Sequence, residues 1–305
     1  MAEVTADHRG GSGGYALVSA AYNEERYIER TLQAVTAQSM LPRKWVVVSD
    51  GSTDRTDEIV HRYADRHAFI ELYRITEEHP RSFTAQVDAI NTGLGRLKGL
   101  DCDFLGNLDS DVSLEPTYFE RLLEKFAQDP KLGLAGGFIY EERGGEFRSR
   151  LGNRTTSVAH AVQLFRRECL DALGGYKPFS WAGTDHHAEV SVRMMGWRAR
   201  SFADLKVFHH RPTGSALGVL HSCYKGGLTD FYIGVHPAFE ALRMARRLIG
   251  KPYIVGALVR LAGFVWAYCR GDERQVSPEF IEFLRKEEIE RVRLLTKQLL
   301  QRLWG

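Results

Sequence analysis

The sequence is poor in the features that mark several common protein classes. Its 305 residues contain four scattered cysteines and no CxxC pair, which indicates a reducing compartment rather than a disulfide framework or a cysteine-rich zinc site. It has no HExxH motif of zinc peptidases and, after its first apolar segment, no GxGxxG motif of dehydrogenases. Residues 1–14 lack the apolar core of a signal peptide, so we expect a disordered tail there.

Neither sign of charge dominates the chain, whose net charge is +2. The part from Glu240 to the end contains 13 Lys/Arg and 8 Asp/Glu, a net of +5, so the first 239 residues carry a net of −3. The net negative charge of the first 239 residues argues against a nucleic-acid partner, which would favour a broad basic face. The net positive charge of the part after residue 239 suits contact with an anionic membrane surface, although a solvated helix face would explain the same charges.

Long apolar runs are also scarce, and the one exception, residues 253–269, carries Arg260 near its middle. A charge at the bilayer centre costs roughly 2.5–3.5 kcal/mol, and the run is shorter than the ~20 residues of a usual span. We therefore expect a helix that packs on the protein or lies at an interface, with Arg260 off its apolar stripe. The stripe comprises Tyr253, Ile254, Ala257, Leu258, Leu261, Phe264, Val265 and Tyr268.

What the sequence does contain is a regular alternation of strand-like and helix-like segments. Apolar segments of strand length occupy 15–21, 44–49, 68–73 and 104–108, and helical patterns follow after residue 23 and at 55–66, 82–98 and 116–128. This alternation predicts an α/β fold with a mostly parallel, Rossmann-like sheet flanked by helices. Further along we expect a strand at 134–141, helices within 155–173 and at 188–195, strands in 198–208, and a last helix at 278–304.

Polar side chains follow three of the predicted strands. Asn23 and Asp50 follow the first two strands, and Asp109 and Asp111 follow the fourth. Because ligands of open α/β sheets bind at the carboxyl ends of the strands, we expect these four residues to converge on one rim. Asn23 is also a candidate cap for the helix that follows it, and Asp50 could accept a hydrogen bond from a ribose hydroxyl or a base N–H.

The segment LDSD (108–111) poses an electrostatic problem. In extended chain Asp109 and Asp111 point to the same side, and two carboxylates so close repel each other. Mg²⁺ is typically held by one or two carboxylates together with substrate phosphates. The pair therefore predicts a divalent metal that carries a diphosphate, whereas helix capping would explain only one of the two acids.

Two later segments add candidate groups. Asp185 stands at the entry to a helix, where it could cap that helix or take a proton from an incoming hydroxyl, and Trp181 could form a wall of the same pocket. His209 and His210 follow a strand that directs them to opposite sides, so one of them could ligate the metal. Arg211 could pair with phosphate.

Several of these motifs occur in a characteristic order. They are YNEE (22–25), VVVSDGSTD (46–54), LDSD (108–111), GGY…GTD (174–185), MGW (195–197) and FHHR (208–211). With them, residues 15–214 resemble the family 2 glycosyltransferases, and in particular bacterial enzymes of surface polysaccharide or exopolysaccharide assembly. The resemblance implies a GT-A (nucleotide-diphospho-sugar transferase) fold over 15–219, with a nucleotide-binding half (15–112) and an acceptor half (113–219). Residues 220–305 would form a helical extension that contacts a membrane or another copy of the chain.

The resemblance also implies an activity. It is the inverting, Mn²⁺- or Mg²⁺-dependent transfer of a sugar from a UDP-, GDP- or dTDP-sugar to a hydroxyl of a saccharide or lipid-linked saccharide, in the cytoplasm or on the cytoplasmic face of the membrane. The implied nucleotide site is Ala21, Tyr22, Glu24, Asp50 and Asp109; the metal site is Asp111 with His209 or His210; the base is Asp185; and Arg81, Arg211 and Trp181 are candidates for phosphate or acceptor contacts.

The chain departs from the family pattern at three places. Ala21 replaces the usual Pro, Thr184 the usual Glu before the base, and Arg81-Ser82 the usual Gly-Lys. The Gln-x-x-Arg-Trp segment of processive synthases is missing. Three alternatives stay open: a nucleotidyltransferase, which normally needs a glycine-rich phosphate loop; a zinc hydrolase built on the two His-His pairs; and a non-catalytic binding or scaffold protein of the same fold, which Thr184 leaves possible.

Overall fold

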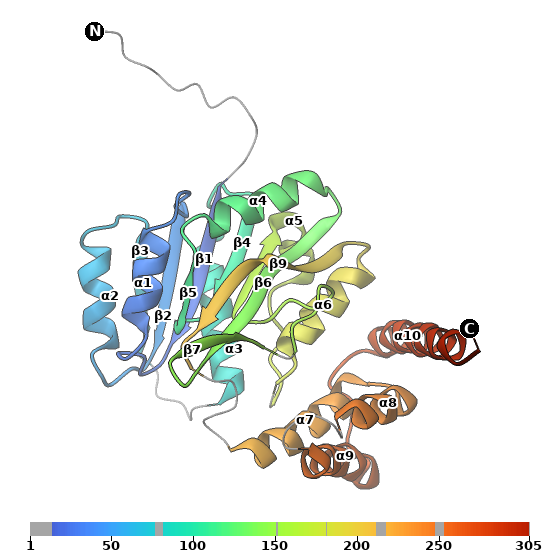
Figure 1. Cartoon of the computed structure of the whole chain (residues 1–305). Helices are drawn as coiled ribbons and strands as arrows, with labels where there is room; N and C mark the ends of the chain where they lie inside the picture. The colour runs from blue at the N-terminus through green and yellow to red at the C-terminus, as the bar shows by residue number, and fades with distance from the viewer. Residues whose placement is uncertain are drawn as a thin grey trace.

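The computed structural model describes residues 14–76, 82–150, 152–180, 182–211, 218–247 and 253–304 (Figure 1). The strands are β1 (Tyr15–Ala21), β2 (Lys44–Asp50), β3 (Ile70–Ile75), β4 (Phe104–Leu108), β5 (Val112–Leu114), β6 (Leu132–Arg143), β7 (Glu146–Ser149), β8 (Val162–Arg166) and β9 (Arg198–His209). The helices are α1 (Ile28–Thr36), α2 (Thr56–Ala64), α3 (Phe83–Arg96), α4 (Tyr118–Gln128), α5 (Arg167–Leu173), α6 (Thr184–Met194), α7 (Val219–Ile233), α8 (Pro237–Arg247), α9 (Tyr253–Arg270) and α10 (Pro278–Trp304).

The strands form one sheet in the order β3-β2-β1-β4-β8-β6-β9-β5, with β7 paired to β6. The first four strands are parallel, β8 runs antiparallel to β4, and β6 and β9 are again parallel. The predicted α/β sheet flanked by helices is therefore confirmed. Its second half is mixed because β8 returns against β4, a reversal that the sequence pattern did not indicate.

Alternating residues of the central strands build a core on each face of the sheet. In β2, Trp45 and Val47 pack with α1, α2 and α4, whereas Val46 and Val48 pack with α3, α5 and α6. All four side chains are fully buried, which is the pattern of a parallel strand covered on both sides. The sheet therefore holds its strand ends in fixed positions, and the polar residues at those ends are fixed with them.

Several local predictions differ from the structure. Asn23 does not cap α1, which begins five residues later; it has φ 53°, and its Oδ1 accepts a hydrogen bond from Thr53 N at 2.8 Å. The helix expected within 155–173 is present as α5, which is capped by Gly174, but strand β8 precedes it in the same region and was not expected. Helix α6 begins at Thr184 rather than at 188, so Asp185 lies in its first turn.

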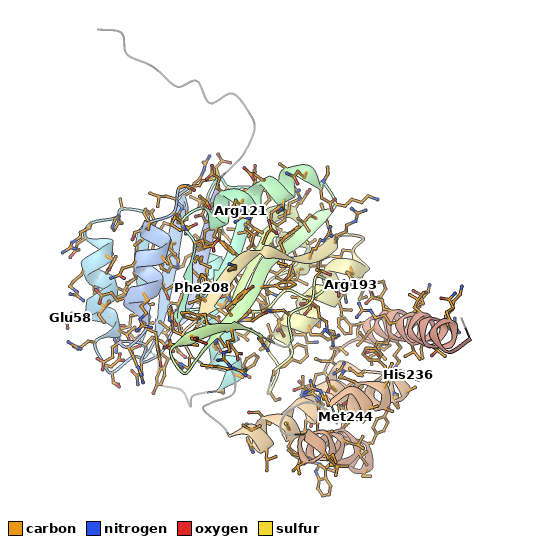
Figure 2. The ribbon with its side chains drawn as sticks, in the orientation of Figure 1. Glu58, Arg121, Arg193, Phe208, His236 and Met244 are labelled. Carbon is orange, nitrogen blue, oxygen red and sulfur yellow. The ribbon has the colours of Figure 1, made fainter. Side chains whose placement is uncertain are left out.

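Helices α7–α10 pack beside α6 rather than on the sheet (Figure 1). Phe179 and Val190 share a hydrophobic core with Leu228, Phe231 and Phe280 of these helices. Arg193 of α6, on the side of the sheet domain that faces them (Figure 2), donates to both carboxylate oxygens of Glu287 at 2.8 and 3.0 Å. The helical extension thus supports the element that carries Asp185.

Helix α9 packs on α7 through small residues. A Cβ added to Gly227 would overlap the backbone oxygen of Arg260, and one added to Gly263 would overlap that of Tyr224. Arg260 itself points toward α7, where its guanidinium lies 2.5 Å from Asp230 Oδ2. Among the described residues, no helix combines the length and hydropathy that crossing a membrane requires.

Candidate active site

A polar cleft of about 650 Å³ of empty space lies at the carboxyl ends of the parallel strands. It is lined by Ala20, Ala21, Tyr22, Glu24, Asp50, Ser82, Gln86, Asp109, Ser110, Asp111 and Arg211. Ala21 ends β1, Asp50 ends β2, and Asp109 follows β4. Parallel pairing of these three strands brings together side chains that are far apart in the sequence, so this cleft is the rim expected from the strand pattern.

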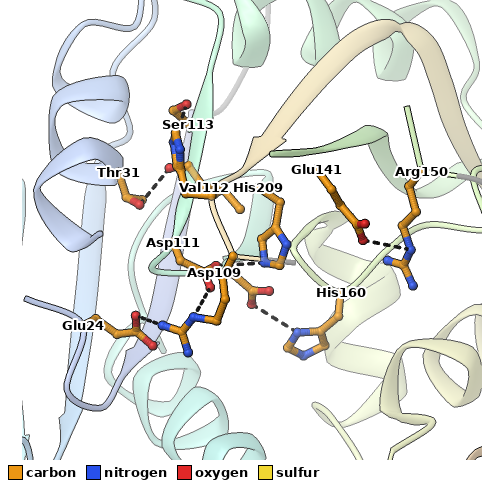
Figure 3. A network of polar contacts seen from close by, with 12 residues as sticks. Glu24, Thr31, Asp109, Asp111, Val112, Ser113, Glu141, Arg150, His160 and His209 are labelled. Atoms are coloured by element: carbon orange, nitrogen blue, oxygen red, sulfur yellow. Dashed lines mark hydrogen bonds and ion pairs between the residues drawn. The ribbon is translucent and has the colours of Figure 1, made fainter. Parts of the chain in front are cut away.

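A group of potential metal ligands lies at this cleft. One ligand atom each of Asp109, Asp111 and His209 lies within 4.8 Å of the others (Figure 3). The tertiary pairing of β5 with β9, in which Val112 is opposite His209, brings the histidine to the two acids. Two carboxylates and one imidazole form a donor set that suits Mn²⁺ or Mg²⁺, so these residues fit a divalent metal.

Hydrogen bonds compensate the charge of this acidic group. Burial by itself would raise the pKa of Asp109, but His160, whose Nδ1 lies 3.3 Å from Asp109 Oδ1, and then the charge of His209 lower it. Burial would lower the pKa of His209. Its Nε2, however, lies 3.1 Å from Asp111 Oδ1, and this carboxylate outweighs burial, so that the pKa of His209 is raised. The carboxylates of Asp109 and Asp111 therefore favour the protonated forms of His160 and His209, at the position where a metal would supply the positive charge.

Arg211 is a further cation at the cleft. Its guanidinium pairs with Glu24, and its Nε lies 3.4 Å from Asp111 Oδ2. Glu24, which is expected to contact the nucleotide, lines the cleft, and its buried carboxylate holds this arginine. Arg211 is thus placed between the metal-ligand group and the remainder of the cleft, within reach of an anionic ligand.

The structure separates the two adjacent histidines. His210 points to the other side of β9, where Arg30 donates to its Nδ1 at 3.0 Å and its Nε2 lies 2.9 Å from Ser113 Oγ. Burial, followed by the charge of Arg30, lowers the pKa of His210. His210 is outside the group formed by Asp109, Asp111 and His209, so His209 is the histidine that the fold brings to the acids.

Asp185 lies in a second, smaller cleft. That cleft is lined by Gly137, Arg150, Gly152, Asn153, Ser157, Ala159 and Asp185. The segment 157–161 connects the two clefts, because Ala159 lines the second one while His160 and the backbone oxygen of Ala161 bind Asp109. Thr184, the substitute for the usual Glu, is buried and donates to Lys177 O at 3.1 Å, which anchors the start of α6.

Glu189, one helical turn after Asp185, holds the segment between the clefts. Its Oε1 accepts hydrogen bonds from Ser157 Oγ at 3.0 Å and Val158 N at 2.5 Å. Burial, and then the charge of Asp185, raise its pKa to about 8, against the effect of these donors. The carboxyl group is therefore protonated at neutral pH.

Sequence reasoning assigned no role in the site to Ser82, Gln86, His160 or Glu189. Ser82 had a signal, since it precedes a helical pattern, and its Oγ accepts from Ala85 N at 3.1 Å as the cap of α3. The other three belong to no recognisable motif and are brought in by tertiary packing. Two predicted candidates, Arg81 and Trp181, lie outside the described residues.

The fold and the rim together define a GT-A type of α/β protein, in which a polar cleft and an acidic group meet at the ends of parallel strands. Two solved structures share this fold. The mannosyltransferase PcManGT from Pyrobaculum calidifontis, in complex with GDP-Man and Mn²⁺, matches with a TM-score of 0.57 and 19% identity over 97% of this chain and 82% of that one. S. aureus TarS 1–349 in complex with UDP-GlcNAc matches with a TM-score of 0.52 and 16% identity over 89% and 78%.

The chain belongs to glycosyl transferase family 2, whose family model matches residues 17–183. Among curated relatives, the poly-beta-1,6-N-acetyl-D-glucosamine synthase of Staphylococcus aureus (strain COL) is 29% identical over 124 residues, 41% of this chain and 28% of the relative. That of Staphylococcus epidermidis is 26% identical over 183 residues, 53% of this chain and 41% of the relative. The chain spans less than half the length of these relatives, and the resemblance to bacterial surface polysaccharide enzymes is confirmed.

Proposed function

We propose that the protein is an inverting, metal-dependent glycosyltransferase that moves a sugar from a nucleotide-diphosphate sugar to an acceptor hydroxyl in polysaccharide or glycolipid assembly. The observation that carries this proposal is the convergence of Asp109, Asp111 and His209 beside a polar cleft, with Asp185 in the neighbouring cleft. The complexes of structural neighbours with GDP-Man and with UDP-GlcNAc support the donor class.

Donor binding follows from the residues of the first cleft. Asp50 accepts from ribose or base donors. Asp109, Asp111 and His209 would hold a divalent cation, which when bound would supply Lewis acidity toward the charge of the leaving diphosphate. Arg211 exchanges its contacts with Glu24 and Asp111 for phosphate oxygens. Ser82, which caps α3, and Gln86 in the first turn of that helix line the same cleft.

Chemistry on the acceptor side is assigned to Asp185. Its carboxylate takes the proton of the acceptor hydroxyl while that oxygen attacks the anomeric carbon from the face opposite the diphosphate, which inverts the configuration in one displacement. Glu189 and His160 fix the segment 157–161 between donor and acceptor. Of the two neighbouring acids Asp185 and Glu189, only Asp185 is available as a base, because the raised pKa of Glu189 favours its protonated form.

The test is a calorimetric titration of nucleotide sugars in the presence and absence of Mn²⁺. We expect one class of donor to bind more tightly with the metal. Asp111→Asn should lower that metal-dependent affinity by at least the roughly 10–100-fold that is typical when a residue supporting a metal ligand is lost. Asp101→Asn is the matched control, since that side chain is 94% exposed and lies outside the cleft. Equal donor affinities in the two variants would contradict the metal assignment.

A further inference from the structure

The outward side of α9 is an exposed apolar surface. Six of its residues are between 43 and 58% exposed: Ile254, Val255, Leu258, Val265, Trp266 and Tyr268. The stripe expected from the sequence is divided by the fold, because Ala257 and Phe264 pack inward while Ile254, Leu258, Val265 and Tyr268 point outward. We call the six exposed residues the outer face of α9.

The outer face of α9 is held in this orientation. Arg260 on the opposite side pairs with Asp230 at 2.5 Å and lies 3.7 Å from Glu240 Oε1, and its side chain is only 15% exposed. Gly227 and Gly263 permit backbone contact between α7 and α9. Rotating the helix to bury its apolar residues would expose apolar Phe264 and take the Arg260 guanidinium away from the buried carboxylates of Asp230 and Glu240, so the exposure follows from the packing.

Charge is distributed around this face in a particular way. Arg260 is the only charged residue in the sequence from 253 to 269, and it points inward, so the outer face carries no charge. In the sequence, Arg247 and Lys251 precede α9 and Arg270 ends it. Arg247 is exposed, and the side chain of Arg270 is 60% exposed and lies 3.2 Å from Asp272. Trp266 and Tyr268 lie next to Arg270, and such aromatic rings favour the boundary between lipid and water.

We propose that the outer face of α9 docks on an anionic phospholipid bilayer, with the helix axis parallel to the membrane plane. The outer face of α9 is apolar and uncharged, which suits the acyl boundary of such a surface, and the basic residues that flank it suit the anionic headgroups. Figure 1 places α9 on the side of the helical extension that is remote from the sheet, so docking leaves both clefts uncovered by α9. This inference goes beyond the proposed function and does not depend on it.

The test is flotation of the full chain with vesicles of phosphatidylcholine containing 30% phosphatidylglycerol. We expect binding at low salt, weaker binding to pure phosphatidylcholine, and at least a tenfold loss in Leu258→Ser/Val265→Ser. The matched control is Leu41→Ser/Leu294→Ser, which removes two apolar residues that are 47 and 60% exposed elsewhere. Absence of binding at low salt, or equal binding by the two double variants, would overturn the proposal.

Two further measurements separate a bilayer from a protein partner. Brominated lipid should quench the tryptophan fluorescence of the wild type, and Trp266→Phe should remove most of that quenching. Light scattering without lipid should give the same mass for the wild type and Leu258→Ser/Val265→Ser. Quenching that persists in Trp266→Phe, or a wild-type dimer that this double variant dissociates, would show that the outer face does not meet lipid.

Discussion

Replacing Glu189 by Gln tests the electrostatics beside the proposed base. Glu189 is 3% exposed, and burial and the charge of Asp185 raise its pKa from 4.5 to about 8. Between these two pH values the folded protein retains a proton that the unfolded chain has lost, so stability falls as the pH rises. Each pH unit of this interval is worth about 1.36 kcal/mol, which gives a loss of up to about 5 kcal/mol by pH 9.

Glutamine keeps the volume of the side chain and an oxygen that can accept from Ser157 Oγ and Val158 N. We therefore expect Glu189→Gln and the wild type to have similar free energies of unfolding at pH 5, and the variant to be more stable by several kcal/mol at pH 9. Urea denaturation at pH 5, 7 and 9 measures both proteins, and their difference cancels the titration of other groups. In an Asp185→Asn background the gain should shrink, because one cause of the raised pKa is removed.

A stability difference that is constant from pH 5 to pH 9 would refute this reasoning, since it would mean that Glu189 is ionised in the folded protein throughout. A gain that is unchanged in the Asp185→Asn background would leave burial as the cause and remove the coupling between the two carboxyl groups.

Three further predictions concern the site and its support. Asp185→Asn should lower kcat by roughly 10²–10⁴-fold, the usual rate contribution of a general base. Near-normal sugar transfer at saturating metal would contradict the assignment of Asp185 as the base. Mn²⁺ affinity should rise with pH through the raised pKa of His209, because only the neutral imidazole ligates a metal. Calorimetry from pH 5.5 to 8.5 measures this affinity, and an affinity that does not change with pH would contradict the assignment of His209 as a ligand. Gly227→Ala should destabilise the protein by about 1–3 kcal/mol through overlap with backbone, whereas Gly95→Ala, in open space on α3, should stabilise it by about 0.5–1 kcal/mol. Thermal unfolding with the same sign for both variants would refute that packing argument.

Much of the fold could be predicted because its parallel half depends on local pattern. Strands β1, β2 and β4 are runs of apolar residues, and the structure has them within a residue of their expected bounds. Strands β5, β7 and β8 are three to five residues long and carry mixed sequence, so no pattern distinguished them. They exist because neighbouring strands supply their hydrogen-bond partners.

The sequence by itself determined which residues would stand at the rim, because Asp50, Asp109 and Asp111 follow buried strands and the ends of parallel strands meet. Only the tertiary structure decided which histidine faces the acids, since that depends on the register of β5 against β9. It also decided the orientation of α9. Helical periodicity shows that apolar residues share a face, but the contact of Gly227 and Gly263 with backbone, and the pairing of Arg260 with Asp230, direct that face outward.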